Sequence, residues 1–150
     1  MDSKQEHAAP YTTETVWDGG GSATGLSQDG QVLRVGEGGG WMPEQLVLFA
    51  AETSFMDRFL AASRSAGVEV LGYVSSGHLE VEDGQQMPRI VLRPCVVVSS
   101  GEEAEALERI ARTALTQSVV GRLCGGRVRV ALDVQHETVP VPPGRPHSNE

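Results

Sequence analysis

The segment that most restricts the fold of this chain runs from Pro43 to about Ala66. Its apolar residues point in almost every direction around a helix instead of forming one stripe: Leu46, Val47, Leu48, Phe49, Ala50, Ala51, Phe55, Met56, Phe59 and Leu60. Pro43 suits the first turn of a helix, and Gly67 supplies a stop. A helix that is apolar all round must be covered on most sides. We therefore predict a long, buried central helix.

The residues before this helix have the pattern of a small antiparallel sheet. Residues 12–17 alternate as in a β-strand, and the glycine-rich run 18–22 interrupts them. Asp29-Gly30 then precedes a second β-rich stretch at 32–35, which is a hairpin signal. Another glycine run, 36–40, leads into the helix. This part predicts an N-terminal β-meander.

Strand patterns return after the helix, at 68–74, 79–81, 90–98 and 128–134. Pro94, within the third of these, favours an edge strand or a bulge. Between the last two strands, Ser100-Gly101-Glu102-Glu103 has the form of a capping box, and apolar residues at helical spacing follow to about Val120. The order of elements predicts an α+β fold.

A chain of 150 residues has the length of one domain, which we place at residues 10–137. Residues 1–9 are polar with no apolar period, and 138–150 contain four prolines. Both ends are predicted to be flexible, because neither pattern supports a helix or a ladder.

The charge balance argues against polyanionic partners. The formal net charge is -8, and aromatic residues make up only 5% of the chain. A negative protein with few rings is poorly suited to nucleic acid or to an anionic membrane surface. The longest apolar run, 46–51, is too short to span a bilayer, and the first residues lack the pattern of a signal peptide. We expect a cytoplasmic protein.

The two cysteines, Cys95 and Cys124, form neither a CxxC motif nor a set with histidine at metal-ligand spacing. We therefore expect no disulfide, no metal and no cofactor. Cys95 lies in an apolar strand and is predicted to behave as a small buried hydrophobe, and Cys124 stands at the end of the second helix.

The run Met42-Pro43-Glu44-Gln45, continuing to Ser54-Phe55, resembles the central-helix motif of the OsmC/Ohr family of osmotically inducible and organic hydroperoxide resistance proteins. In that family a Pro-Glu opening leads, ten residues after the glutamate, to a Cys-Phe pair. A second motif, Cys-Pro-x-Ser, matches Ser118-Val119-Val120-Gly121 by its separation from the first. Both cysteine positions are therefore serine in this chain.

The resemblance implies an intertwined homodimer with sites at the subunit interface. It also implies a stress-response peroxidase in which two cysteines, a loop arginine and the Pro-Glu glutamate act on organic hydroperoxides. Here the matching loop, 19–24, contains no arginine, so Glu44 is the one assisting group that remains. The candidate catalytic positions are Ser54, Ser118 and Glu44.

Serine cannot replace cysteine in peroxide reduction, because the cycle requires a thiolate that becomes a sulfenic acid. Our first hypothesis is therefore an OsmC-like protein without thiol peroxidase activity. On an unbroken helix Glu44 lies about 15 Å from Ser54 along the axis, so its alternative role is that of a first-turn glutamate favoured by the helix dipole. Glu52, Asp57 and Arg58 either line a pocket near Ser54 or face solvent.

Two other functions remain open. One is a binding protein whose interface pocket holds a small apolar ligand or a hydroperoxide, with a lining of Trp41, Phe49, Phe55 and Met56. The other is a weak serine-dependent hydrolase, for which His78 is the only histidine inside the predicted domain and near a plausible pocket.

Overall fold

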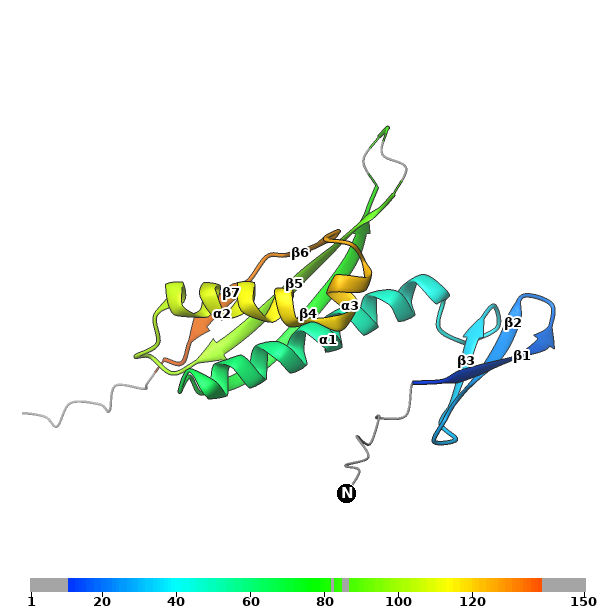
Figure 1. Cartoon of the computed structure of the whole chain (residues 1–150), viewed down its shortest axis with the longest axis horizontal. Helices are drawn as coiled ribbons and strands as arrows, with labels where there is room; N and C mark the ends of the chain where they lie inside the picture. Colours follow the sequence, from blue (N-terminus) through cyan, green and yellow to red (C-terminus); the bar gives the residue numbers. More distant parts are fainter. Residues whose placement is uncertain (1–10, 82, 85–86, 139–150) are drawn as a thin grey trace, which may run out of the picture. The chain divides into compact units, whose positions relative to one another are not determined.

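The computed structural model describes residues 11–81, 83–84 and 87–138 (Figure 1). These residues divide into two compact units, with the boundary between Val47 and Leu48. The predicted flexible segment 1–9 lies outside the described residues, as does 139–150 of the proline-rich end. Each unit is described separately below.

The first unit contains the predicted meander. Strands β1 (Thr13–Gly19), β2 (Ser22–Ser27) and β3 (Val32–Gly36) form an antiparallel sheet in that order. The Asp29-Gly30 turn joins β2 to β3, with Gly30 at a φ of +82°. None of residues 11–40 is buried. The meander therefore has no core of its own.

Helix α1 extends over Pro43–Ser65, close to the predicted limits. Its buried residues, Ala51, Phe55, Phe59 and Ser63, recur every four positions and form one face. The hydroxyl of Ser63 donates to the Phe59 carbonyl at 2.8 Å, so this buried polar group is satisfied. Val47 and Phe49 remain 48% and 50% exposed in the single chain, so burial of α1 on most sides remains a prediction that requires a second chain.

In the second unit, strand β4 (Val70–Glu80) is continuous and pairs antiparallel with β5 (Arg89–Val98). The separate strands predicted at 68–74 and 79–81 are therefore one, because Ser75, Ser76 and Gly77 pair with β5 instead of forming a turn. On its other side β5 pairs in parallel with β6 (Val128–Val130) and then with β7 (Asp133–His136). The single strand predicted at 128–134 is thus two short ones.

Pro94 lies in the central strand β5, so its prediction as an edge residue is wrong. The Leu92 carbonyl accepts a hydrogen bond from Ala131 N–H, so the backbone of Leu92 points toward β6 and β7. Backbone groups two residues apart point to the same side of a strand, so the backbone N of Pro94 faces β6 and β7 as well. There β6 pairs with 90–92 and β7 with 95–98, which leaves a gap opposite residues 93 and 94. A proline is tolerated in this strand because no ladder partner requires its missing N–H.

The predicted second helix is broken at Ser118 into α2 (Ala104–Gln117) and α3 (Val119–Leu123). The predicted capping box at Ser100 is also wrong. The chain makes a turn first, with Glu102 N–H donating to the Ser99 carbonyl, and the helix opens only at Ala104. Glu103 is therefore the N-cap, and its side chain makes no capping hydrogen bond.

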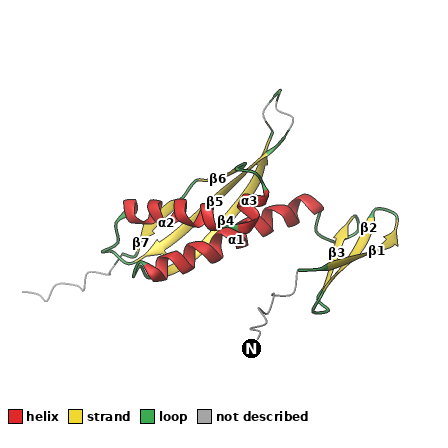
Figure 2. Ribbon diagram, viewed as in Figure 1, coloured by secondary structure: helices red, strands yellow, loops and turns green. Residues whose placement is uncertain are grey.

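One hydrophobic core holds α1, α2 and the second sheet together. Figure 2 shows these two helices beside the strands of that sheet. The alternate residues 90, 92, 96 and 98 of β5 all belong to this core, so both helices pack on the same face of the sheet. The buried residues are Ala51, Phe55, Phe59, Val68, Ile90, Leu92, Val96, Val98, Leu107, Ile110, Ala111, Ala114 and Val128. This α+β arrangement fixes the middle of α1 against the break between α2 and α3.

Candidate functional site

Ser54 and Ser118 meet where α1 passes this helix break. Their hydroxyl oxygens lie 2.8 Å apart in a hydrogen bond that either group can donate. Ser118 is 1% exposed and caps two helices at once: its N–H donates to the Ala114 carbonyl at the end of α2, and its Oγ accepts from Gly121 N–H at the start of α3. Val120 N–H also approaches Ser54 Oγ, at 3.5 Å.

This pair of serines has the geometry of a structural contact. The partners of the two hydroxyls among the described residues are each other and the backbone N–H groups of Val120 and Gly121. No histidine or carboxylate is among these partners, and a serine nucleophile needs such a base. His78, which we considered for that role, lies in β4 with its Nε2 3.3 Å from Glu80 Oε1.

Neither native thiol takes part in this contact. Cys95 stands in β5 opposite Asp133 of β7, and Cys124 caps the end of α3. Both are free cysteines of intermediate exposure, so the prediction that Cys95 is a buried hydrophobe is wrong. Desolvation and the hydrogen bond and negative charge of Asp133 raise the pKa of the Cys95 thiol. A raised pKa leaves less thiolate, which is the reactive form.

Glu44, the third predicted catalytic residue, lies exposed in the first turn of α1. It belongs to the first unit, whereas Ser54 and Ser118 belong to the second. A carboxylate at this position interacts favourably with the positive end of the helix dipole.

A small cleft of about 170 Å³ opens between α1 and β4. Phe49, Glu52, Thr53 and Met56 line it from the helix, and Tyr73 and Ser75 line it from the strand. Two of the four predicted ligand-lining residues, Phe49 and Met56, are therefore present. Phe55 is not, because its ring lies in the core with its centroid 5.8 Å from that of Phe59. Trp41 belongs to the first unit, where it bridges to Val35.

Three polar side-chain atoms of this cleft are buried without a hydrogen-bond partner. Glu52 Oε1, Tyr73 OH and Ser75 Oγ are buried and have no hydrogen-bond partner within bonding geometry. Desolvation raises the pKa of Glu52 and raises that of Tyr73 to about 12. The nearby Ser75 hydroxyl lowers the pKa of Glu52 and that of Tyr73, without forming a well-aligned hydrogen bond to either residue. The negative charge of Glu52 raises the pKa of Tyr73 further. Tyr73 therefore remains a neutral phenol at ordinary pH.

Sequence reasoning found part of this cleft. Glu52 was considered as a pocket residue together with Asp57 and Arg58, but the last two are exposed and pair with each other at 3.2 Å. Tyr73 and Ser75 were missed as site residues. The available signal was their spacing of two in a strand, which places both side chains on one face.

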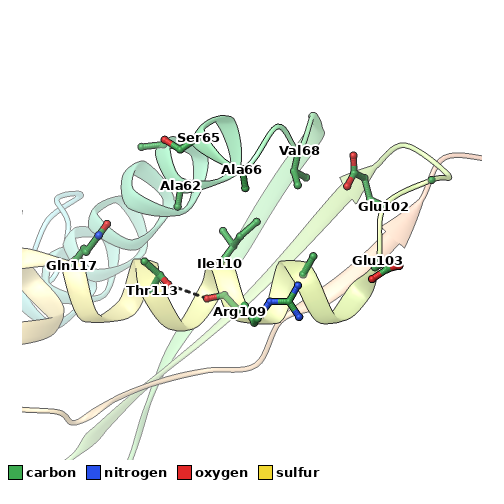
Figure 3. Close-up of a pocket in the computed structure, with 13 residues that line it drawn as sticks. Ala62, Ser65, Ala66, Val68, Glu102, Glu103, Arg109, Ile110, Thr113 and Gln117 are labelled. Atoms are coloured by element: carbon green, nitrogen blue, oxygen red, sulfur yellow. Dashed lines mark hydrogen bonds between the residues drawn. The ribbon is translucent and has the colours of Figure 1, made fainter.

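A larger cleft, of about 800 Å³, lies elsewhere, between the C-terminal half of α1 and α2 (Figure 3). Small residues such as Ala62 and Ala66 line one wall, and Arg109, Thr113 and Gln117 contribute to the other. None of the candidate catalytic residues lines this cleft. It is an open groove between two helices and is separate from the serine contact.

Within the residues that the structure describes, no group of three His, Cys, Asp or Glu side chains is placed to hold a metal ion. No helix in the same residues combines the length and apolar character needed to cross a bilayer.

Several known structures that match this chain are named OsmC-like or organic hydroperoxide resistance proteins. No family model matches the chain, and no curated protein matches its sequence. An OsmC-like protein from Mycoplasma pneumoniae matches with a TM-score of 0.71 and 11% identity over 85% of this chain and 96% of that one. The organic hydroperoxide resistance protein OhrB of Bacillus subtilis matches with a TM-score of 0.61 and 15% identity over 84% and 98%.

A third match is the organic hydroperoxide resistance protein OsmC from Legionella pneumophila, with a TM-score of 0.64 and 16% identity over 86% of this chain and 98% of that one. The class defined by these findings is the OsmC-like fold. The proteins that share it with this chain include organic hydroperoxide resistance proteins. The fold predicted from the Pro-Glu motif and the order of elements is therefore confirmed.

Proposed function

We propose that this chain is an OsmC-like protein that does not reduce hydroperoxides by thiol chemistry. In this proposal Ser54 and Ser118 occupy the positions of the two redox cysteines. The observation that supports it is the 2.8 Å contact between two hydroxyls 64 residues apart, since these are the residues aligned with the cysteines by motif and spacing. Hydroxyls have no counterpart of the sulfenic acid that a thiol peroxidase forms.

The direct test is a coupled assay of cumene hydroperoxide reduction with a dithiol reductant. We expect no enzymatic turnover by the wild-type protein. Dithiol-dependent turnover by the wild-type protein would overturn the proposal. The variant carrying both Ser54→Cys and Ser118→Cys is the matched positive control, and it is expected to form a disulfide on oxidation because the two side-chain atoms already lie in contact.

We further propose that the protein is a homodimer. The meander lacks buried residues, and Val47 and Phe49 of α1 are 48% and 50% exposed, so a second copy provides natural cover. Native mass spectrometry at micromolar concentration should give a dimer. Phe49→Lys should shift the population toward monomer, whereas the exposed Arg64→Ala should not. A monomeric wild-type protein would contradict this part of the proposal.

The second candidate function is the binding of a small ligand, and it is favoured by the cleft that Phe49, Glu52 and Tyr73 help to line. Mass spectrometry of the native protein as purified would reveal a retained ligand as an added mass that denaturation removes.

Free cysteines are usual in a reducing compartment, which supports a cytoplasmic location.

A further inference from the structure

The cleft between α1 and β4 combines apolar walls with buried polar atoms that lack partners. The walls come from Phe49 and Met56, while Glu52 Oε1, Tyr73 OH and Ser75 Oγ supply the polar atoms. A buried polar atom without a partner destabilises the folded state, and this cleft contains three such atoms. A ligand that hydrogen-bonds to them would recover part of that cost.

The position of the Glu52 carboxylate depends on the absence of a side chain at Gly77, in the facing strand β4. A Cβ atom placed on Gly77 of β4 would lie 3.2 Å from Glu52 Oε1 and 3.3 Å from Leu92 Cδ2. Because Gly77 is a glycine, the Glu52 carboxylate has room to lie against the strand. A side chain at position 77 would crowd the carboxylate at the cleft.

The charge of the cleft is unbalanced. Its six lining residues are Phe49, Glu52, Thr53, Met56, Tyr73 and Ser75, and none of them is cationic. A desolvated carboxylate is stable only when it is neutralised or paired with a positive charge. Phe49 adds an aromatic ring at the mouth, and ring faces attract organic cations.

We infer that this cleft binds a small organic ammonium ion, with the ammonium group on Glu52 and Ser75 and the apolar body between Phe49 and Met56. An ammonium group has several N–H donors, which suits the carboxylate and the hydroxyl oxygens. The volume of about 170 Å³ fits a body near the size of one benzene ring. The inference deepens the ligand-binding role proposed above.

Desolvation by burial raises the pKa of Glu52, which agrees with this assignment because no cationic side chain lines the cleft. A neutral ligand would satisfy the hydroxyls but leave the carboxylate uncompensated. A carboxylate ligand would add a second negative charge. The electrostatics therefore favour a cation over both.

Titration with benzylammonium and with benzyl alcohol, followed by amide chemical shifts of the full-length protein, tests the inference. The two probes have nearly the same shape and differ in charge. Hydrogen bonds to charged groups are worth more than neutral ones, so we expect the ammonium to bind the wild type at least about tenfold more tightly. In Glu52→Gln this preference should fall to about one, and shifts in the wild type should centre on Phe49, Glu52 and Tyr73.

Asp57→Asn is the matched control, because it removes the same charge from the same helix at an exposed position. It should leave the preference for the ammonium unchanged. Tyr73→Phe provides a second cleft variant if Glu52→Gln fails to fold, and it should weaken binding of both probes. Equal binding of the two probes to the wild type, an unchanged preference in Glu52→Gln, or no binding at millimolar concentration would each overturn the inference. Peroxide turnover is measured separately, so its outcome does not decide this one.

Discussion

The hydroxyl oxygen of Ser54 in α1 lies 2.8 Å from that of Ser118, which occupies the break between α2 and α3. The contact joins the central helix to the point at which the second helix changes direction. Ser118 is fully buried there and caps α3, so this pair contributes to the architecture whatever else it does.

Ser118→Ala should lower the free energy of unfolding by about 1–2 kcal/mol, since it removes a helix cap, leaves the Gly121 N–H without its side-chain partner and leaves the Ser54 hydroxyl with only the long contact from Val120 N–H. Ser54→Ala should cost less, because Ser118 still caps α3. Urea denaturation of both single variants and the double variant gives the coupling energy between them. Strictly additive effects would show that the hydroxyl contact contributes nothing to stability.

Glu52 should make the stability of the protein depend on pH. Burial raises the pKa of Glu52 above its ordinary 4.5, so the folded state holds this proton more tightly than the unfolded state does. The resulting stabilisation is complete below the unfolded pKa and is lost as pH rises through the folded one. Relative to the wild type, Glu52→Gln should therefore gain stability as pH rises from below 4.5 to neutral. Thermal melts of both proteins across this range measure the difference, and parallel curves would contradict the prediction.

Gly36→Ala should weaken the meander. Gly36 has a φ of +103°, and a Cβ atom at this position would overlap the Gly21 carbonyl oxygen across the sheet. The expected cost is about 1–3 kcal/mol from backbone strain, with the overlap adding to it. Gly20→Ala is the control, since its φ of +60° carries strain but nothing lies within 4 Å of its Cβ position. Hydrogen exchange of the β2 and β3 amides should speed up more in the first variant.

Cys95 should react slowly with iodoacetamide. Desolvation and the neighbouring Asp133 raise its pKa, so the thiolate fraction at pH 8 is smaller than that of a free cysteine. Asp133→Asn should accelerate the reaction by removing the negative charge. Mass spectrometry of the modified peptide follows the rate, and an alkylation rate equal to that of a model thiol would show that the strand does not protect this residue.

The order of elements could be predicted because periodicity survives in the sequence. The alternation at 12–17, the Asp29-Gly30 turn and the apolar run from Pro43 each act over a few residues, and all three appear in the structure. The points at which strands and helices end were harder to predict. Ser75, Ser76 and Gly77 have turn-forming composition but pair along β5, because a cross-strand partner outweighs local preference.

The sequence by itself determined the class of fold and the apolar character of α1, since these depend on residue type and spacing. Only the tertiary structure decided that Ser54 and Ser118 touch, that Pro94 fits a central strand and that Glu52, Tyr73 and Ser75 share a cleft. These outcomes depend on how residues far apart in the chain pack together. The serine contact and the gap beside Pro94 exist only once the helices and strands have packed together. The carboxylate of Glu52 is desolvated only once that packing has excluded water.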